Sequence, residues 1–322
     1  MNDGNNTIGD RQLAIGNHKS VVECVPNFSE GRKVDTIRRL VAVIEGVETA
    51  CVLDTHMDPD HNRSVITFVA APERVVEAAV RAVALAVELI DMRQHSGQHP
   101  RLGATDVLPF VPVRNVTIDD CVMLAHQAGG RIAQELSIPV FFYERAALKP
   151  ERINLEDVRR GALELLREQI ASEPGRAPDV GPLRVHESAG AIAVGARPFL
   201  IAFNVNLRTS DLAIARQIAR LVRARHGGLP FLKALGFELS SRGLVQVSMN
   251  LVNYGETGMR QAFEAVRREA DKLGVEVANT EIVGLVPENA LDKDAEYFQK
   301  LENFTEDKVL ESRMRACEGR VK

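Results

Sequence analysis

Hydrophobic and polar residues follow one another along the chain in short blocks that predict strands and helices in a regular order. Runs of β-branched and apolar residues predict strands at residues 21–25, 50–53, 64–70, 107–113 and 139–143. Apolar residues at helical spacing predict helices at 33–44 and 119–136, and a long helix that starts at Pro72 and ends near residues 92–94. The order β-α-β-β-α-β-α-β indicates a mixed α/β sheet covered by helices, not a purely parallel one.

The second half of the chain repeats a similar order. A helix-like stretch over 155–170 leads into a Pro- and Gly-rich segment, 172–181, which we take as the domain boundary. Beyond it the pattern again predicts β-α-β-β-α-β, with strands and helices at 199–206, 211–225, 235–239, 244–251, 258–273 and 275–283. We therefore expect a disordered tail over 1–20, an N-terminal subdomain over 21–180 and a C-terminal subdomain over 181–322. The last of these ends in charged helices that form a solvated cap.

Composition narrows the classes of function. The 322 residues are 45% hydrophobic, and 40 Lys+Arg face 44 Asp+Glu, so no basic footprint for nucleic acid is present. The most apolar stretch, 75–90, is interrupted by Glu77, Arg81 and Glu88, which is wrong for a membrane span. The four cysteines are far apart and form no CxxC motif. We expect reduced thiols in a cytoplasmic protein, at Cys24, Cys51, Cys121 and Cys317.

A turn between the long helix and the next strand concentrates reactive side chains. Residues 95–106 contain His95, His99, Arg101 and Asp106, with Gly97, Pro100 and Gly103 between them. A histidine there is able to titrate near neutral pH and to be oriented by an acid, as general acid–base chemistry requires. The alternative is a helix end at which His and Arg interact with the helix dipole. Composition alone leaves both open.

The segment between two predicted strands, 54–63, has the composition of a metal site. It contains three aspartates and two histidines, Asp54, His56, Asp58, Asp60 and His61. It does not fit an EF-hand, because the sixth position lacks Gly and Ile66 stands where the last acidic ligand belongs. The alternative is a polar loop whose Asp and Asn side chains bond their own backbone.

Two further segments are candidates for ligand binding. Residues 181–190 are polar and flanked by glycines, which fits either a ligand-binding wall or a linker. Asn204 and Asn206 are two apart in a predicted strand and therefore project from one face. A phosphate-binding loop at 190–197 is rejected, because Ala196 and Arg197 replace the Lys-Ser/Thr pair.

Several of these strings together resemble one family. They are the ECVPNFSEG string at 23–31, Asn62-Arg63, Asp91-Met92, the HxGxHPRxGAxDV string at 95–107 and FNVNL at 203–207. They closely resemble the formiminotransferase domain of the formiminotransferase-cyclodeaminase family, over nearly the whole chain. The resemblance implies a cytoplasmic enzyme of histidine degradation that moves the formimino group of N-formimino-L-glutamate to N5 of tetrahydrofolate. It also implies two α/β subdomains, a homodimer, folate in an electropositive channel between the subdomains, and no metal.

The resemblance also assigns residues. The family's catalytic histidine falls on His99, and its folate-binding segment falls on Gly181, Pro182, Leu183, Arg184, Val185, His186, Glu187, Ser188, Ala189 and Gly190. Two positions depart from the pattern: His56 stands where an acidic residue is expected near the active site, and Ala189 where an aromatic one is expected. The second change removes a stacking surface for an aromatic ring.

We expect His99 to act as general acid and base, with Asp54 or Asp106 orienting it and His56 nearby. Arg63, Arg101 and Arg197 are candidate clamps for substrate carboxylates, since Arg pairs with them through two hydrogen bonds. No room remains after Lys322 for a cyclodeaminase domain, so we expect a separate protein to carry out that step.

Two other functions remain open from the sequence. One is a metal-dependent hydrolase that uses the Asp54–His61 cluster together with His99. The other is a folate-binding protein that has kept the pocket and lost turnover.

Overall fold

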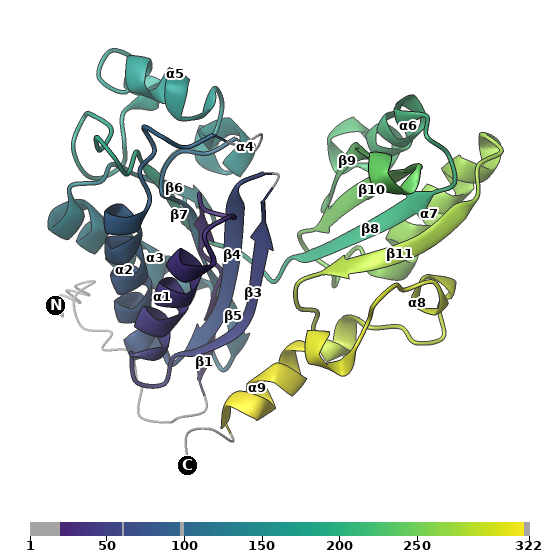
Figure 1. Ribbon diagram of the computed structural model, residues 1–322, viewed down its shortest axis with the longest axis horizontal. Helices are drawn as coiled ribbons and strands as arrows, with labels where there is room; N and C mark the ends of the chain where they lie inside the picture. Colours follow the sequence, from purple (N-terminus) through teal and green to yellow (C-terminus); the bar gives the residue numbers. More distant parts are fainter. Residues whose placement is uncertain (1–19, 60, 97–99, 319–322) are drawn as a thin grey trace, which may run out of the picture.

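The computed structural model describes residues 20–59, 61–96 and 100–318, and it has two lobes, each a β-sheet with helices packed against it (Figure 1). The predicted mixed α/β fold is confirmed: the first sheet is mixed and the second is antiparallel. The tail predicted over 1–20 lies outside the described residues except for Ser20. In the described part of the chain, no helix combines the length and apolar character that crossing a membrane requires.

The first sheet has seven strands. They are β1 (Val21–Cys24), β2 (Asn27–Phe28), β3 (Cys51–Asp58), β4 (Arg63–Ala70), β5 (Thr105–Arg114), β6 (Val140–Glu144) and β7 (Ile192–Ala196). β3 pairs with β4, and β4 pairs with β1 and β2, which also pair with β5; these pairings are antiparallel. β7 is parallel to both β5 and β6. One face is covered by α1 (Val34–Glu45), α2 (Pro72–Leu89) and α3 (Ile118–Leu136) (Figure 1).

Strand alternation decides what the other face of this sheet carries. Val22 and Cys24 of β1 and Ile66 of β4 are buried against the three helices. Glu23, between the two β1 residues, and Arg63, three residues before Ile66, therefore project from the opposite face, which is turned toward the second lobe. This face therefore carries charged residues from β1, β3 and β4.

The position of strand β7 shows that the domain boundary lies later in the chain than predicted. The strand lies beyond residue 180, yet it is hydrogen-bonded between β5 and β6. The boundary placed between 180 and 181 is therefore wrong, because the Pro- and Gly-rich segment connects two parts of one sheet. Such a segment looks the same in sequence whether it joins two domains or two elements of one domain. The change of lobe comes at residues 197–200, between β7 and the next strand.

The helix predicted over 155–170 is broken in two. The structure has α4 (Leu155–Val158) and α5 (Ala162–Gln169), separated by Gly161, whose φ is +76°. A left-handed backbone at this point favours glycine and cannot continue an α-helix. The two short helices cover the second face of the sheet over β6 and β7, through buried Val158 and Leu166.

The second lobe confirms the repeated β-α-β-β-α-β order. Its strands are β8 (Ile201–Leu207), β9 (Leu232–Leu239), β10 (Leu244–Leu251) and β11 (Val277–Val283), and its main helices are α6 (Leu212–Val222) and α7 (Met259–Lys272). The strand order β9-β10-β8-β11 matches the order β3-β4-β1-β5 in the first lobe. Short 3-10 turns lie at Pro150–Arg152, Pro174–Arg176, Ala224–His226, Ser240–Arg242, Glu288–Ala290 and Glu306–Lys308.

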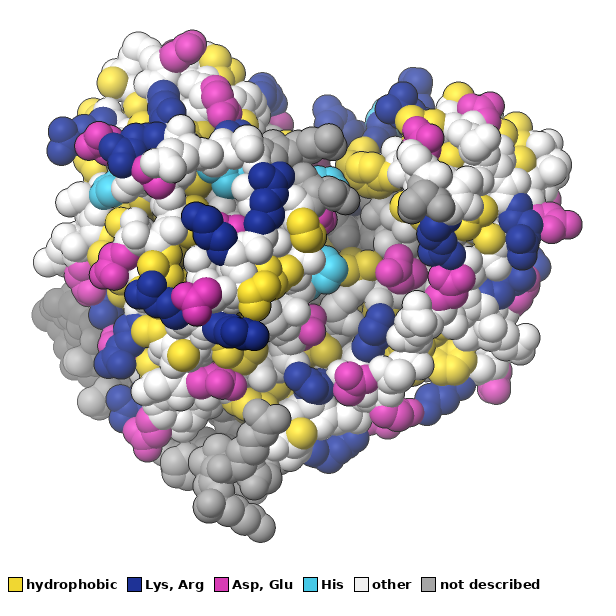
Figure 2. Space-filling view, viewed as in Figure 1, with side chains coloured by type: hydrophobic (Ala, Val, Ile, Leu, Met, Phe, Trp, Pro, Cys, Tyr) yellow, Lys and Arg dark blue, Asp and Glu magenta, His cyan; other side chains and the backbone are white. Residues whose placement is uncertain are grey.

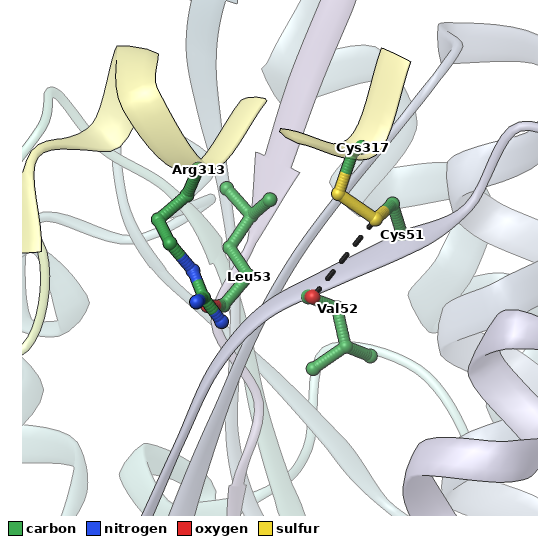
Figure 3. Close-up of a disulfide and its surroundings, with 5 residues drawn as sticks. All are labelled: Cys51, Val52, Leu53, Arg313 and Cys317. Atoms are coloured by element: carbon green, nitrogen blue, oxygen red, sulfur yellow. Dashed lines mark hydrogen bonds between the residues drawn. A yellow bond between two sulfur atoms is a disulfide. The ribbon is translucent and has the colours of Figure 1, made fainter. Parts of the chain in front are cut away.

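The C-terminal helices are not a purely solvated cap, so that prediction is wrong. After α8 (Glu296–Gln299), α9 (Leu310–Glu318) returns to the first lobe and packs Leu310 and Met314 against Leu53 of β3. Arg313 Nε donates a hydrogen bond of 2.7 Å to Leu53 O, and Cys317 forms a disulfide with Cys51 (Figure 3). Because the segment is rich in charged residues, its sequence gave no sign that one face of α9 is buried against the other lobe.

The disulfide also corrects the expectation of four reduced thiols. Cys51 and Cys317 are 266 residues apart in sequence, and only the return of α9 brings them together. Cys24 and Cys121 are free and buried. The lobes meet again where Lys233 of β9 pairs with Glu156 of α4, at 3.4 Å. The surface is hollowed between the two lobes, with Lys and Arg side chains on both sides (Figure 2).

Candidate functional site

The chemistry-bearing motifs of the first lobe meet at one end of its sheet. A small pocket there is lined by residues from three segments, namely Asn27, Phe28, Ser29, His61, Asn62, Arg63, His95, Arg101 and Asp106. It adjoins a cleft of about 400 Å³ that shares Ser29, Asn62 and His95 and runs toward the start of α1 and the end of α2. The strings at 23–31, 62–63 and 95–107 are thus brought together.

Asn62 holds these segments in place. Its side-chain oxygen accepts a hydrogen bond of 3.0 Å from Gly31 N, and its amide nitrogen donates one of 3.0 Å to Ser96 O. Its own carbonyl oxygen lies 3.0 Å from His95 Nε2. The residue has φ of +50°, a conformation that Asn tolerates better than most residues. One buried amide therefore fixes the turn between β3 and β4 relative to both neighbouring loops.

Gly31 is required by the same close approach. A Cβ atom at this position would lie 2.2 Å from Asp58 O and 2.6 Å from Arg63 N. These contacts are with backbone atoms, which cannot rotate away. The loop after β2 is therefore pressed directly onto the β3–β4 turn.

Arg101 is a structural member of the His-containing turn. Its Nε donates a 3.1 Å hydrogen bond to His95 Nδ1, and its two terminal nitrogens contact the Glu164 carboxylate at 2.8 and 3.2 Å. The guanidinium is thus already paired on both sides, and its use as a substrate clamp remains a prediction.

Asp106 lies at an irregularity in β5. Asn27 pairs with Val107, and the next residue, Phe28, pairs with Thr105, so Asp106 is an extra residue in the ladder. Such bulges redirect a side chain. Its carboxylate accepts a 2.8 Å hydrogen bond from Leu102 N and pairs with Arg159 of the α4–α5 break. Asp106 therefore anchors the turn that precedes β5.

Arg63 lies beside this pair, in an unusual electrostatic setting. Burial lowers the pKa of its guanidinium, and the positive charge of Arg159 lowers it further, while Asp58 and Asp106 act in the opposite direction. Asp58 is itself engaged by His61: Asp58 Oδ2 lies 2.6 Å from His61 Nδ1, and Asp58 Oδ1 accepts from His61 N at 3.0 Å. Partial burial acts to raise the pKa of Asp58, but these hydrogen bonds lower it overall.

The other predicted residues of β3 lie on the same face. Asp54, His56 and Asp58 pair with alternate residues of β4, from Thr67 to Arg63. Asp54 is half-buried and His56 is exposed. Both side chains therefore face the space between the lobes, away from the first lobe's helical core.

His99 and Asp60 lie outside the described residues, as do Gly97 and Gln98. The described neighbours of His99 in sequence are Pro100, which is exposed, and Arg101. Among the residues that the structure describes, no group of three or more His, Cys, Asp or Glu side chains is arranged to hold a metal ion.

The segment 181–190 lies against the His-containing turn. Ser188 O accepts a 2.7 Å hydrogen bond from Met92 N, and Ala189 O accepts one of 2.9 Å from Ala104 N. Glu187 pairs with Arg93 at 2.9 Å. Ala189 is only 2% exposed and belongs to the apolar core of the first lobe. The position at which an aromatic ring was expected therefore faces the core, whereas Leu183, Arg184 and Glu187 are exposed.

Arg197 is not part of the pocket. Its backbone N donates to Phe110 O, four residues along β5 from Asp106, a separation of about 13 Å along an extended strand. Its guanidinium donates to Pro198 O at 3.0 Å. Glu23 is only 2% exposed, and burial raises its pKa to about 7, while the positive charge of Arg197 acts in the opposite direction.

In the second lobe, Phe203 and Val205 of β8 are buried in the core beneath α6 and α7. Asn204 and Asn206 alternate with them and therefore project from the opposite face of the sheet. Asn206 Nδ2 donates to Asn279 Oδ1 at 2.6 Å, and its Oδ1 accepts from Gln246 at 3.0 Å. Asn204 Nδ2 donates to Glu281 at 3.3 Å, while its Oδ1 is buried without a partner in the described part of the chain. This is a polar face with one acceptor still available.

Two members of the site were missed in the sequence. Arg159 and Glu164 lie in the stretch predicted as one helix, and only the break at Gly161 brings them to the His-containing turn. The glycine itself was the available signal, since it stands inside an otherwise helical pattern.

Comparison with known proteins agrees with this geometry. Residues 21–197 match the model of the N-terminal subdomain of the formiminotransferase domain, and residues 202–315 match the model of the formiminotransferase domain. The change from one model to the other coincides with the linker between β7 and β8.

Curated relatives match over most of the chain. One from Thermoplasma acidophilum, named glutamate formimidoyltransferase, is 48% identical over 92% of this chain and 97% of its own length. Another of that name, from Streptococcus pyogenes serotype M1, is 45% identical over 88% of this chain and 95% of its own. A formimidoyltransferase-cyclodeaminase from Dictyostelium discoideum is 43% identical over 91% of this chain and 56% of its own. The resemblance found in the motifs is confirmed: this chain belongs to the formiminotransferase domain family.

Proposed function

We propose that this protein is a formimino-group transferase that moves the formimino group of N-formimino-L-glutamate to N5 of tetrahydrofolate. Membership of the family and the names of its relatives support the reaction class. The observation that carries the proposal is the meeting of His95, Asn62 and Arg63 at one pocket. These residues belong to the same strings as His99.

The reaction requires that the two substrates are positioned next to each other and that one group transfers a proton between them. N5 of tetrahydrofolate attacks the amidine carbon of the donor, and a tetrahedral intermediate forms. A proton leaves N5, and a proton is delivered to the glutamate nitrogen as its bond to the carbon breaks, which yields 5-formiminotetrahydrofolate and glutamate. His99 carries this proton in both steps, because one imidazole is able to accept and then donate it.

The surrounding residues take supporting roles in the proposal. His95 and Arg101, which flank His99 in the sequence, are joined to each other by a hydrogen bond, and Asp54 and His56 face the interlobe space. Asp106 accepts a hydrogen bond from Leu102 N, and with Asp54 it remains a candidate to orient His99. The exposed part of segment 181–190 and the polar face at Asn204 line the path for folate.

The wider setting is proposed with it. We infer a homodimer, a place in histidine degradation in the cytoplasm, and a separate cyclodeaminase for the product, in line with relatives in which the two names are joined. Glutamate and folate carry at least two carboxylates each, and the Arg residues at the pocket suit them.

Product analysis tests the reaction. The purified protein is mixed with N-formimino-L-glutamate and tetrahydrofolate in parallel reactions with and without a chelator, and both products are quantified. We expect glutamate and 5-formiminotetrahydrofolate in equal amounts, and no glutamate release when folate is left out. Glutamate release at the same rate without folate would instead identify a hydrolase, and its loss on chelation would assign that activity to a metal.

A further inference from the structure

We propose that the disulfide between Cys51 and Cys317 is a redox-controlled latch, which holds α9 on strand β3 and so keeps the space between the lobes in its working arrangement. Reduction of this bond by a dithiol releases α9 from the first lobe and lowers the rate of group transfer. The effect on the transfer rate rests on the proposed function, whereas the release of α9 does not.

Helix α9 connects the two lobes. Its first residue is tied to the second lobe, because Leu310 N donates a 2.9 Å hydrogen bond to Val286 O, and Val286 belongs to the core of that lobe. Its body lies on the first lobe, where Met314 and Cys317 share an apolar cluster with Leu53 of β3 (Figure 3). The helix is therefore a strap across both lobes, and the bond that fixes it also restrains the lobes relative to each other.

The strap covers an irregularity in β3 that directs residues of the candidate site. Val52 pairs with Phe68 of β4. Asp54 pairs with the neighbouring residue of β4, Thr67, so Leu53 is an extra residue in the ladder. This bulge turns Asp54 toward the interlobe space, since without the extra residue Asp54 would point toward the helices, as Val52 does.

Contacts with α9 stabilise this bulge. Arg313 Nε donates its 2.7 Å hydrogen bond to Leu53 O, and the Leu53 side chain is only 1% exposed beneath the strap. Cys51, two residues before Leu53, carries the disulfide. Release of α9 therefore exposes Leu53, removes a hydrogen bond from the bulge and loosens the positions of Asp54 and His56, which follow it in β3.

The helix is too short to stay docked without support. It has nine residues, and helices of fewer than about 12 residues are marginal in water on their own. After reduction, its docking on the first lobe relies on the apolar contacts of Leu310 and Met314 and on the hydrogen bond of Arg313. We therefore expect the reduced protein to leave α9 undocked for part of the time.

The position of the disulfide suits reversible exchange. Among the strands that the structure describes, β3 pairs only with β4, so Cys51 lies on an edge strand, and it is half-buried. In the cytoplasm, the proposed location, disulfides that form are usually transient or redox-sensing. The two free thiols do not compete in this chemistry, because burial raises the pKa of Cys24 and raises that of Cys121 to about 12, which disfavours the reactive thiolate.

The exchange is a two-electron step. One thiolate of the dithiol attacks a sulfur of the Cys51–Cys317 bond, which breaks, so that a mixed disulfide forms and the other cysteine leaves as a thiolate. The second thiolate of the dithiol then displaces the remaining protein sulfur. Both cysteines end as thiols that carry the two protons of the dithiol, and the dithiol ends as a disulfide. Oxidised glutathione reverses the step and is itself reduced to two thiols.

The test compares oxidised and reduced wild type with two variants, Cys317→Ala and Cys121→Ala. Each protein is equilibrated without oxygen in mixtures of reduced and oxidised glutathione or dithiothreitol. Free thiols are alkylated and counted by mass, and amide hydrogen exchange of residues 310–317 is measured in the same samples. The transfer rate is measured after the small thiols are removed, still without oxygen, so that tetrahydrofolate stays reduced.

On reduction of wild type we expect exchange in α9 to become at least about tenfold faster and kcat/KM to fall at least about tenfold. Both changes should follow the fraction of disulfide lost, and reoxidation should reverse them. Cys317→Ala should resemble reduced wild type in every mixture, because it cannot form the bond. Cys121→Ala is the matched control: Cys121 is buried and outside the pair, so this variant should respond as wild type does.

The outcomes separate this inference from the proposed function. Wild type that loses the disulfide with no change in either measurement overturns the latch, as does protein that keeps four free thiols in oxidised glutathione. Faster exchange in α9 with an unchanged transfer rate overturns the control of the site. If neither form transfers the group while exchange in α9 still follows the disulfide, the proposed function fails and the latch stands.

Discussion

Replacing Asn62 by Ala should damage both stability and activity, since one side chain ties three segments together. The change leaves the buried Gly31 N–H without an acceptor, which costs about 1–3 kcal/mol, and removes the bond to Ser96 O, which water is able to replace in part, for about 0.5–1 kcal/mol. Ala also tolerates the left-handed backbone at φ +50° less well than Asn, by about 1 kcal/mol. The total is about 2.5–5 kcal/mol.

Urea denaturation of wild type and variant gives the free energy of unfolding, and the transfer assay gives kcat. Asn303→Ala is the matched control, because Asn303 is exposed and also has a positive φ, of +54°. It should lose only the backbone part, about 1 kcal/mol, and keep full activity. For Asn62→Ala we expect kcat to fall at least about tenfold, as the loops around the pocket shift. If both variants lose the same stability and Asn62→Ala keeps its kcat, the amide does not organise the site.

Three further changes test other parts of the structure. Cys51→Ser should lower the free energy of unfolding by up to about 5 kcal/mol, because the disulfide closes a loop with a sequence separation of 266; thiol titration of the denatured wild type should find two free thiols of four, and finding four would contradict the pairing. Glu23 has a folded pKa of about 7, above its ordinary value of 4.5, so its contribution to stability is fully present below about pH 4.5 and is lost as the pH rises through 7. Glu23→Gln should therefore be the more stable protein at pH 8, by up to about 3 kcal/mol, and an identical pH dependence in both proteins would refute the burial argument. Gly103→Ala would place a Cβ 2.2 Å from Ala191 O and should cost about 3 kcal/mol or more, whereas Gly130→Ala, with no atom within 4 Å, should stabilise α3 by about 1 kcal/mol; equal melting temperatures would argue against the close approach.

Local patterns predicted most of the fold. Most strands and helices of both lobes follow from period-two and helical spacing, although no strand was predicted at the position of β7, and the repeated β-α-β-β-α-β order came from the same source. The misses share one cause: they depend on contacts between distant parts of the chain. β7 belongs to the first sheet because it pairs in parallel with β5, which is far from it in sequence. One face of α9 is buried because it packs against the first lobe.

The residues of the site likewise fall into those that the sequence predicted and those that it missed. Asn62, Arg63, His95, Arg101 and Asp106 were found because they lie in dense polar strings, and the structure brings them to one pocket. Arg159 and Glu164 were missed because charged residues in a helical stretch normally face solvent. Cys51 and Cys317 give no local sign of their pairing. The sequence therefore identified residues whose side chains are able to take part in catalysis or binding. The tertiary structure determines which of these residues contact one another.

The central claim, that one imidazole shuttles the proton of the transfer, is tested most directly by a single-turnover measurement on His99→Ala. Enzyme in excess is mixed with N-formimino-L-glutamate and tetrahydrofolate, and formation of 5-formiminotetrahydrofolate is followed in time, with His126→Ala as a folded control from α3. For His99→Ala we expect a rate about 10²- to 10⁴-fold below wild type, and for the control an unchanged rate. A His99→Ala protein that transfers the group as fast as wild type would contradict it.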